Sequence, residues 1–277
     1  MTETLEAPMP DLAAVKQRQQ QAWSSGDFAV VASRMALVSE QLADSADLRA
    51  GWRVLDVATG SGNAAIAAAR LGSTVVGVDY VPSLLERGRE RAAAEGLAVE
   101  FLEGDAEELP FPDACFDAVT SVFGAMFAPD HGRAAAELLR VSRAGGTIAL
   151  ASWTPGGFIG ELFRTTAAHV PPPPGVAAPM LWGTEGHLRE LFGDGIESLA
   201  VTERTFTWRF AAPEEFVEFF RTWYGPTVKA FAALEGDARN ALERDLVDLA
   251  RRRDRLGPNV DAVAIPAAYT EAIAIVR

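Results

Sequence analysis

The sequence predicts a doubly wound α/β fold, built on a mostly parallel sheet with helices on both faces. Three observations support this prediction. Short apolar segments rich in β-branched residues alternate with segments rich in Ala, Arg and Glu, as in repeated βα units. Several apolar segments are continuous rather than alternating, as strands covered on both faces require. A glycine-rich turn at residues 58–62 joins the first strand to the helix after it.

The individual elements follow from this pattern in chain order. Residues 1–10 are expected to form a loose tail, and a helical pattern with a Gly-Asp break covers residues 12–47. The expected strands are Arg53–Val57, Thr74–Val78, Val99–Glu103, Phe116–Ser121, Thr147–Ser152, Glu197–Phe210 and Ala267–Val276. The expected helices after the first strand are Asn63–Leu71, Ser83–Glu95, Arg133–Val141, Pro213–Trp223, Pro226–Leu234 and Asp237–Leu256. Residues 154–195, rich in Gly, Pro and aromatics, are assigned no helix or strand.

Charge and composition exclude several classes of function. The chain has 277 residues, with 25 Lys and Arg against 38 Asp and Glu, which gives a formal charge of −13. Because phosphate backbones are bound mainly by Lys and Arg, we expect no nucleic-acid partner for a chain whose only lysines are Lys16 and Lys229. The single cysteine, Cys115, excludes an intramolecular disulfide and a multi-thiolate metal site. The three histidines show no metal-ligand spacing, so no metal is expected.

The N-terminal stretch has neither the basic region nor the apolar region of a secretory signal. No segment approaches the ~20 consecutive apolar residues that a membrane-spanning helix needs. The sequence therefore predicts a cytoplasmic protein without a membrane span.

Four motifs follow one another at the ends of predicted strands. The first is the strand-turn-helix "VLDVATGSGN" that contains Asp56, and the second is Asp79, 23 residues further on, where a carboxylate accepts both hydroxyls of a ribose. Asp105 follows the third strand, and the Gly145-Gly146 turn precedes the fifth. Each motif alone has a structural alternative, a tight turn or a solvated carboxylate. Together they converge on the crevice where open α/β sheets bind ligands.

The segment from Trp23 to Trp153 resembles the class I S-adenosylmethionine-dependent methyltransferases. Four motifs carry this resemblance and occur in the family's order: "LDVATGSG", "GVDYVPSLL", "GDAEELPFPDACFD" and "RVSRAGG". The segment is closest in pattern to the ubiquinone/menaquinone-biosynthesis type. The resemblance implies a Rossmann-like methyltransferase fold with a seven-stranded sheet, and S-adenosylmethionine as the cofactor. It also implies three parts: an N-terminal helical lid at 1–50, a cofactor-binding core at 51–153, and an inserted helical cap with the last two strands at 154–277.

The resemblance also implies which residues bind the cofactor. They are Ala58, Thr59 and Gly60 at the methionine part, Asp79 at the ribose, Tyr80, Asp105 and Ala106 at the adenine, and Ser121 and Val122 at the ammonium group. One position departs from the family's usual D/E-x-G-x-G-x-G motif, because Ala58 stands at its first glycine. We expect a negative φ there, so that the β-carbon of Ala58 shifts the backbone slightly without abolishing cofactor binding.

By the same resemblance, the N-terminal helices fold over the cofactor as a lid. Trp23 and Phe28 are expected to contribute to it, and Arg34 is expected to pair with the methionine carboxylate. Core packing of the two aromatic side chains and a surface ion pair for Arg34 remain the alternative.

Aromatic residues are frequent after Trp153 and predict an apolar cap, which favours a small hydrophobic acceptor over a polymer. Phe216, Phe219, Phe220 and Trp223 have helical spacing, and such a stripe is more typical of a core. The residues expected to contact the acceptor are Phe123, Trp153, Trp182 and Tyr224.

Methyl transfer from a sulfonium is an in-line displacement, in which positioning alone can contribute ~7–11 kcal/mol. The sequence need not supply a catalytic triad. The candidate bases are His131, after the fourth strand, and more distantly His169 and His187, and each is more typical of a surface or capping histidine. Asp130 before it is the expected N-cap of the next helix.

Two other functions remain open from the sequence. A nicotinamide-dependent oxidoreductase shares the first turn and the acidic residue after the second strand, but "ATGSGN" lacks the third glycine of G-x-G-x-x-G and no Tyr-x-x-x-Lys pair exists. A protein that keeps the cofactor fold without transferring a methyl group, in a binding or cyclisation role, is the second alternative.

Overall fold

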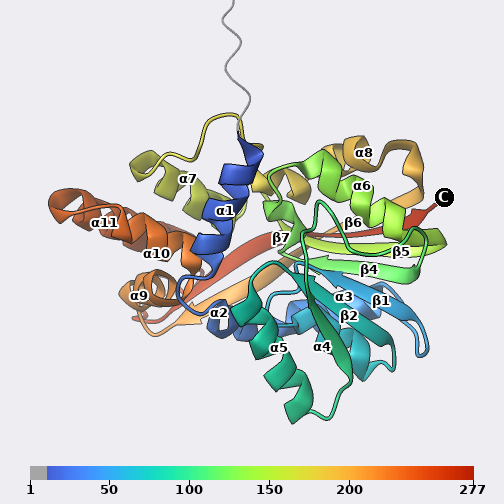
Figure 1. The fold of residues 1–277 in the computed structure, drawn as a ribbon. Helices are drawn as coiled ribbons and strands as arrows, with labels where there is room; N and C mark the ends of the chain where they lie inside the picture. Colours follow the sequence, from blue (N-terminus) through green and yellow to red (C-terminus); the bar gives the residue numbers. More distant parts are fainter. Residues whose placement is uncertain (1–10) are drawn as a thin grey trace, which may run out of the picture.

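The structure, a computed structural model, describes residues 11–277, so the tail predicted at residues 1–10 lies outside the described residues. Its centre is a seven-stranded sheet in the order β3-β2-β1-β4-β5-β7-β6 (Figure 1). The strands are β1 (Arg53–Val57), β2 (Thr74–Asp79), β3 (Val99–Glu103), β4 (Phe116–Val122), β5 (Ser142–Trp153), β6 (Ile196–Phe210) and β7 (Val263–Val276). The first five pair in parallel and β7 is antiparallel to both β5 and β6, which confirms the predicted fold class.

Helices cover both faces of this sheet, and in Figure 1 α4 and α5 lie on one side of it and α6 and α8 on the other. Their bounds are α1 (Leu12–Trp23), α2 (Phe28–Arg34), α3 (Ala36–Ser45), α4 (Asn63–Arg70), α5 (Pro82–Ala94), α6 (His131–Val141), α7 (Phe158–His169), α8 (Glu185–Phe192), α9 (Pro213–Trp223), α10 (Gly225–Ala232) and α11 (Gly236–Arg253). Three short 3-10 helices are η1 (Ala125–Phe127), η2 (Pro179–Gly183) and η3 (Gly193–Gly195).

The central strands form where the sequence is continuously apolar. Val54, Leu55 and Val57 of β1 are completely buried, because helices cover the strand from both sides. Helix α6 buries one stripe, including Leu138. It begins as predicted at an N-cap, since the Asp130 side chain accepts a hydrogen bond from the Arg133 N–H at 2.9 Å.

Residues 154–195 differ from the prediction, because they contain α7, η2 and α8. The glycines and prolines of this segment lie mostly at helix starts and in the connections, where they interrupt the helical periodicity of the sequence. Strand β5 begins at Ser142, so the predicted Gly145-Gly146 turn is an irregularity inside a strand, marked by a shift in the register with β4. Strand β7 begins four residues before the predicted start because it pairs with β6 over almost its whole length.

The long β6–β7 ladder extends beyond the parallel part of the sheet toward α9, α10 and α11 (Figure 1). Phe216, Phe219 and Phe220 of α9 are buried, as their spacing indicated, whereas Trp223 is partly exposed. Helix α1 packs against α10 and thereby lies between this helical end and the carboxyl ends of the strands.

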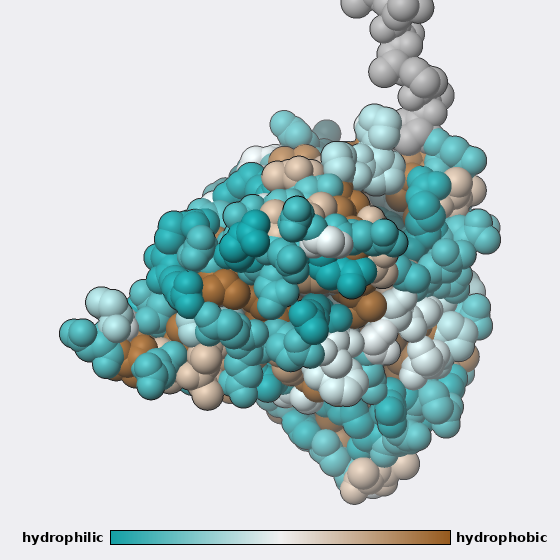
Figure 2. All heavy atoms as spheres, turned by 90° about the vertical axis from the view of Figure 1, so that its left-hand side faces the viewer, coloured by the Kyte–Doolittle hydropathy of each residue, from teal (hydrophilic) through white to brown (hydrophobic). Residues whose placement is uncertain are grey.

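The surface of this end is mainly hydrophilic, with small separate hydrophobic patches (Figure 2). Its partly exposed apolar residues, such as Trp223 and Leu256, are scattered. None of the helices formed by residues 11–277 combines the length and apolarity that crossing a bilayer requires.

Candidate active site

A cavity of about 310 Å³ opens at the carboxyl ends of the parallel strands. Its volume lies at the lower end of the range typical of small-molecule sites, roughly 300–1,000 Å³. It is enclosed by α1, α2 and the loops after β1, β2, β3 and β4. The predicted residues that line it are Trp23, Ala58, Thr59, Gly60, Asp79, Tyr80, Asp105, Ala106, Val122 and Phe123. The topology therefore brings most of the predicted cofactor residues together.

The buried carboxylate of Asp56, near the end of β1, hydrogen-bonds to the loop that follows this strand. One of its oxygens accepts hydrogen bonds from the Thr59 hydroxyl at 2.5 Å and the Ala65 N–H at 3.1 Å, and the other accepts from the Thr120 hydroxyl at 3.0 Å. Burial raises the pKa of Asp56 to about 6, and the hydrogen bonds counteract part of that shift. Asp56 thus fixes the loop against the start of α4.

The N-cap of helix α4 is Gly62, a position that only glycine can occupy without disturbing the packing. Its φ is +83°, and a β-carbon there would lie 2.8 Å from the Phe101 ring of β3. The glycine therefore permits both the left-handed turn and the close approach of β3.

Asp79 ends β2 and presents a second buried carboxylate to the cavity. One oxygen accepts from the Gly60 N–H at 2.8 Å and the other from the Val81 N–H at 2.9 Å. Burial raises the pKa of Asp79 to about 6 despite these bonds. Each carboxylate oxygen can accept more than one hydrogen bond, so both keep capacity for ligand hydroxyls.

Lys16 of α1 contacts the loop after β3, a pairing that sequence analysis missed. Its ammonium lies 2.5 Å from Asp105 and 2.6 Å from Glu107, whose carboxylate is almost fully buried. Burial lowers the pKa of Lys16, but its bonds to the two carboxylates outweigh this and raise it overall. The available signal was the rarity of lysine in the chain. Its partners, about 90 residues away, left no local pattern.

Two glutamines extend this polar contact along the same face of α1. The Gln20 side-chain amide donates to the Tyr80 carbonyl at 2.6 Å, and that of Gln19 donates to the Phe127 carbonyl at 3.1 Å. Together with Lys16 and Trp23, they occupy positions one helical turn apart. Helix α1 is therefore fastened over the cavity.

The backbone at Ala58 differs from the prediction of a negative φ. Its φ is +52°, in the left-handed region that favours glycine. The loop keeps the conformation of a glycine-rich turn because the bonds from Asp56 and Asp79 determine its path. The β-carbon of Ala58 is accommodated because its neighbour across the cavity wall, Gly124, has none; a β-carbon on Gly124 would lie 2.7 Å from it.

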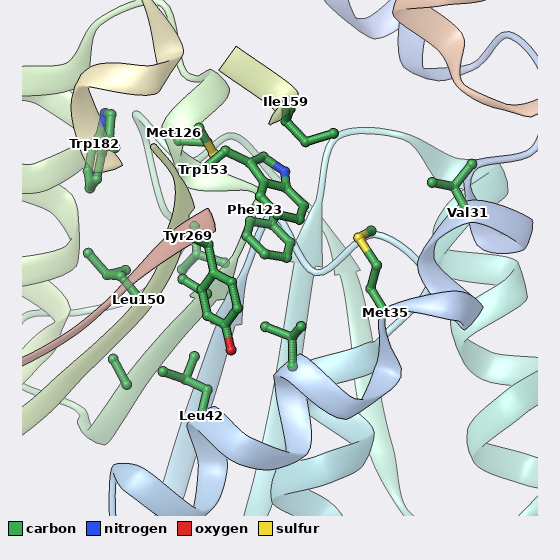
Figure 3. Packing of buried hydrophobic residues seen from close by; sticks show 14 of the residues in the cluster. Val31, Met35, Leu42, Phe123, Met126, Leu150, Trp153, Ile159, Trp182 and Tyr269 are labelled. Atoms are coloured by element: carbon green, nitrogen blue, oxygen red, sulfur yellow. The ribbon is translucent and has the colours of Figure 1, made fainter. Parts of the chain in front are cut away.

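The end of β4 supplies the opposite wall of the cavity. Ser121 does not line it; its hydroxyl donates to the Val57 carbonyl at 2.7 Å and accepts from the Ala125 N–H at 2.9 Å. Val122 and Phe123 do line it. Phe123 has φ +55°, which is rare for an aromatic residue, and its ring stacks on Trp153 with centroids 3.8 Å apart (Figure 3).

A second, smaller cavity of about 20 Å³ adjoins the apolar end of the first, and we call it the aromatic annex. Trp23, Phe28, Met35, Phe123 and Phe127 line both cavities. The residues that line only the annex are Val31, Trp153, Ile159, Trp208, Phe220 and Tyr224. Two predicted acceptor residues, Trp153 and Tyr224, therefore lie beside the main cavity rather than in it.

Arg34 does not reach the cavity. Its guanidinium lies over the Phe219 ring, 3.9 Å from the centroid, on the exposed end of α2. Arg34 was predicted to pair with the methionine carboxylate of the cofactor or, alternatively, to form a surface ion pair. Its position over the Phe219 ring matches neither prediction.

Trp182 and His131 pack together away from both cavities. Trp182 is completely buried in η2, because the Pro- and Gly-rich segment around it folds onto the sheet instead of forming an open loop. His131 packs edge-on against it, with Nδ1 2.9 Å from Nε2 of His187. Burial, and secondarily His187, lowers the pKa of His131 to about 4, so it is neutral at pH 7.

Comparison with known proteins adds the family. A methyltransferase-domain family model matches residues 55–150. An uncharacterized protein of Mycobacterium tuberculosis is 40% identical over 252 residues, covering 89% of this chain and 92% of the relative. The demethylmenaquinone methyltransferase of Thermus thermophilus is 38% identical over 161 residues, covering 52% of this chain and 73% of the relative.

The chain belongs to the class I S-adenosylmethionine-dependent methyltransferases. This assignment replaces the nicotinamide-dependent alternative. A putative methyltransferase of Bacillus halodurans has the same fold as this methyltransferase, with a TM-score of 0.59 and 20% identity, over 86% of this chain and 97% of the other.

We predict that Ala58→Gly stabilises the methyltransferase. A left-handed conformation costs a non-glycine residue about 1–2 kcal/mol, and the greater entropy of glycine in the unfolded chain offsets part of this gain. We expect a net gain of up to ~1 kcal/mol, or about 2–4 °C in Tm, measured by calorimetry. Ala114→Gly is the matched control, since Ala114 has φ +52° outside the site and is expected to gain similarly. A lower Tm for Ala58→Gly alone would contradict the prediction.

Proposed function

We propose that this methyltransferase transfers the methyl group of S-adenosylmethionine to a small, apolar acceptor by in-line displacement in a closed pocket. The observation that carries the proposal is the division of one cavity into two ends. The carboxylates of Asp56, Asp79 and Asp105 line one end, and aromatic side chains line the other. A nucleoside suits the first end and an apolar acceptor the second.

The residues at the polar end fit the cofactor. Its charged lining residues are the carboxylates of Asp56, Asp79 and Asp105 and the single ammonium of Lys16. This excess of negative charge favours S-adenosylmethionine, whose sulfonium and ammonium outnumber its one carboxylate. Asp79 is proposed to accept the ribose hydroxyls, because both of its oxygens have free capacity.

The loop after β3 is proposed to bind the adenine. Tyr80, from the loop after β2, and Ala106 also line this part of the cavity. Asp105 can still accept from the amino group of the adenine through its remaining lone pairs, although one of its oxygens is paired with Lys16 and the other accepts from the Glu107 N–H at 2.9 Å. The adenine and α1 would then share this carboxylate, which brings the lid directly against the cofactor.

When bound, the cofactor supplies a methyl group already activated by a positively charged sulfur. The tasks left to the chain are to align the acceptor with that methyl group and to exclude water. Helix α1, fastened through Lys16, Gln19 and Gln20, covers the cavity. Phe123, at the junction of the main cavity and the annex, separates the polar end from the aromatic end. The arrangement supports catalysis by positioning, without a histidine base.

We predict that cofactor affinity depends on the ionisation of Asp79. Its carboxylate must be charged to accept both ribose hydroxyls, and its pKa is about 6 before binding. Affinity for S-adenosylmethionine is therefore constant above pH 7 and falls below pH 6. We expect an approximately tenfold larger Kd at pH 5 than at pH 7, measured by isothermal titration calorimetry.

Asp79→Asn serves as the control for this pH dependence. It keeps the size of the side chain but removes its charge, so the Kd should be higher at pH 7 and change little between pH 5 and 7. An unchanged tenfold pH effect in the variant would show that another group, such as Asp56, is responsible.

Methyl transfer itself is tested by detecting S-adenosylhomocysteine over a panel of acceptors. We expect turnover with uncharged apolar compounds rather than with charged ones of similar size. His131→Asn should keep at least half of the wild-type rate, because His131 lies outside both cavities. Binding of S-adenosylmethionine without turnover of any acceptor would favour the non-methylating alternative.

A further inference from the structure

Two residues that line the aromatic annex, Trp208 and Tyr224, carry a hydrogen-bond donor without a partner among residues 11–277. Nε1 of Trp208 is buried and unpaired. The hydroxyl of buried Tyr224 forms no hydrogen bond with residues 11–277, and burial alone raises the pKa of Tyr224. Leaving a buried polar group unpaired costs about 1–3 kcal/mol, so the buried indole N–H of Trp208 calls for an explanation.

Packing does not explain the hydroxyl of Tyr224. Its ring lies among other aromatic rings, with centroids 5.5 Å from Trp23, 6.1 Å from Phe28 and 5.3 Å from Phe220. Phenylalanine would make the same ring contacts without an unpaired hydroxyl. The hydroxyl is therefore available for a ligand.

The charges around the annex restrict what that ligand group can be. None of the residues that line it carries a charge, so an ion there would lose its hydration without compensation. An indole N–H can only donate, and burial keeps the Tyr224 phenol protonated at neutral pH. The matching group is uncharged and accepts hydrogen bonds.

The volume of the annex restricts the size of the group. About 20 Å³ is close to the ~10–15 Å³ that a single water molecule needs, and far below the roughly 150 Å³ of an apolar cavity that binds benzene. The body of an acceptor therefore stays in the main cavity, and one substituent reaches the annex. The side chains that line the annex offer a water molecule two donors and a single acceptor, the Tyr224 oxygen, which is fewer acceptors than a buried water molecule can use.

We propose that Tyr224 positions the methyl acceptor by donating a hydrogen bond to one uncharged oxygen substituent that the acceptor inserts into the aromatic annex. This inference rests on the proposed function, since it requires the acceptor to occupy the aromatic end of the main cavity. It assigns Tyr224 as a positioning residue and the acceptor as an uncharged compound that bears a hydroxyl or carbonyl oxygen.

The test compares two probes that differ in one group, 4-fluorophenol and 4-fluorotoluene. Their affinities are measured by ¹⁹F NMR titration with the protein saturated with S-adenosylhomocysteine. In Tyr224→Phe, the affinity for 4-fluorophenol relative to 4-fluorotoluene should fall about tenfold. This is the loss in affinity expected when one hydrogen bond in a buried site is removed. A third probe, the carboxylate 4-fluorobenzoate, should bind at least tenfold more weakly than 4-fluorophenol.

Tyr269→Phe is the matched control, because Tyr269 is also buried but lines neither cavity. It should leave the ratio of the two affinities unchanged. Trp208→Phe provides a second variant should Tyr224→Phe fail to fold, and it should also lower the ratio severalfold.

An unchanged ratio in Tyr224→Phe, or in Trp208→Phe where Tyr224→Phe does not fold, would overturn the inference and assign the annex to packing. Binding of 4-fluorobenzoate as tightly as 4-fluorophenol would also overturn it. Calorimetry with S-adenosylmethionine separates this failure from that of the proposed function. If S-adenosylmethionine binds and the affinity ratio does not change, only the assigned role of Tyr224 is wrong. If S-adenosylmethionine does not bind, the proposed function itself is wrong.

Discussion

The site depends on two buried carboxylates, Asp56 and Asp79, at the carboxyl ends of adjacent parallel strands. Through backbone and hydroxyl donors they determine the path of the glycine-rich loop between them. Burial raises both pKa values to about 6 from the ordinary value of 3.8, so between pH 4 and 6 the folded chain binds more protons than the unfolded chain. Stability therefore falls as pH rises through this range, and the two charges are retained at a cost in free energy.

The two carboxylates fix the loop at the acidic end of a cavity whose other end is lined by aromatic rings. Acidic side chains lie on the β1–β3 side, and aromatic rings lie on the side of β4 and α9. Phe123 lines both cavities, and it combines a positive φ with a ring stacked on Trp153. Helix α1 then closes both ends at once, with Lys16 over the acidic side and Trp23 over the rings.

The sequence predicted the parallel sheet and the loops that carry Asp79 and Asp105, because these features have local signatures in hydrophobic runs and turns. It did not predict contacts that depend on distant packing. Lys16 meets Asp105 only because α1 folds back over the sheet, and Trp182 becomes buried because its Pro-rich segment docks instead of forming a loop. The positive φ of Ala58 arises from the bonds around the loop, which override the local preference of alanine.

A crystal structure with S-adenosylhomocysteine tests the central claim most directly. The account predicts both ribose hydroxyls within hydrogen-bond distance of the Asp79 carboxylate, and the sulfur facing Phe123 at the aromatic end. A nucleoside bound outside this cavity, or inside it with the ribose turned away from Asp79, would contradict the account.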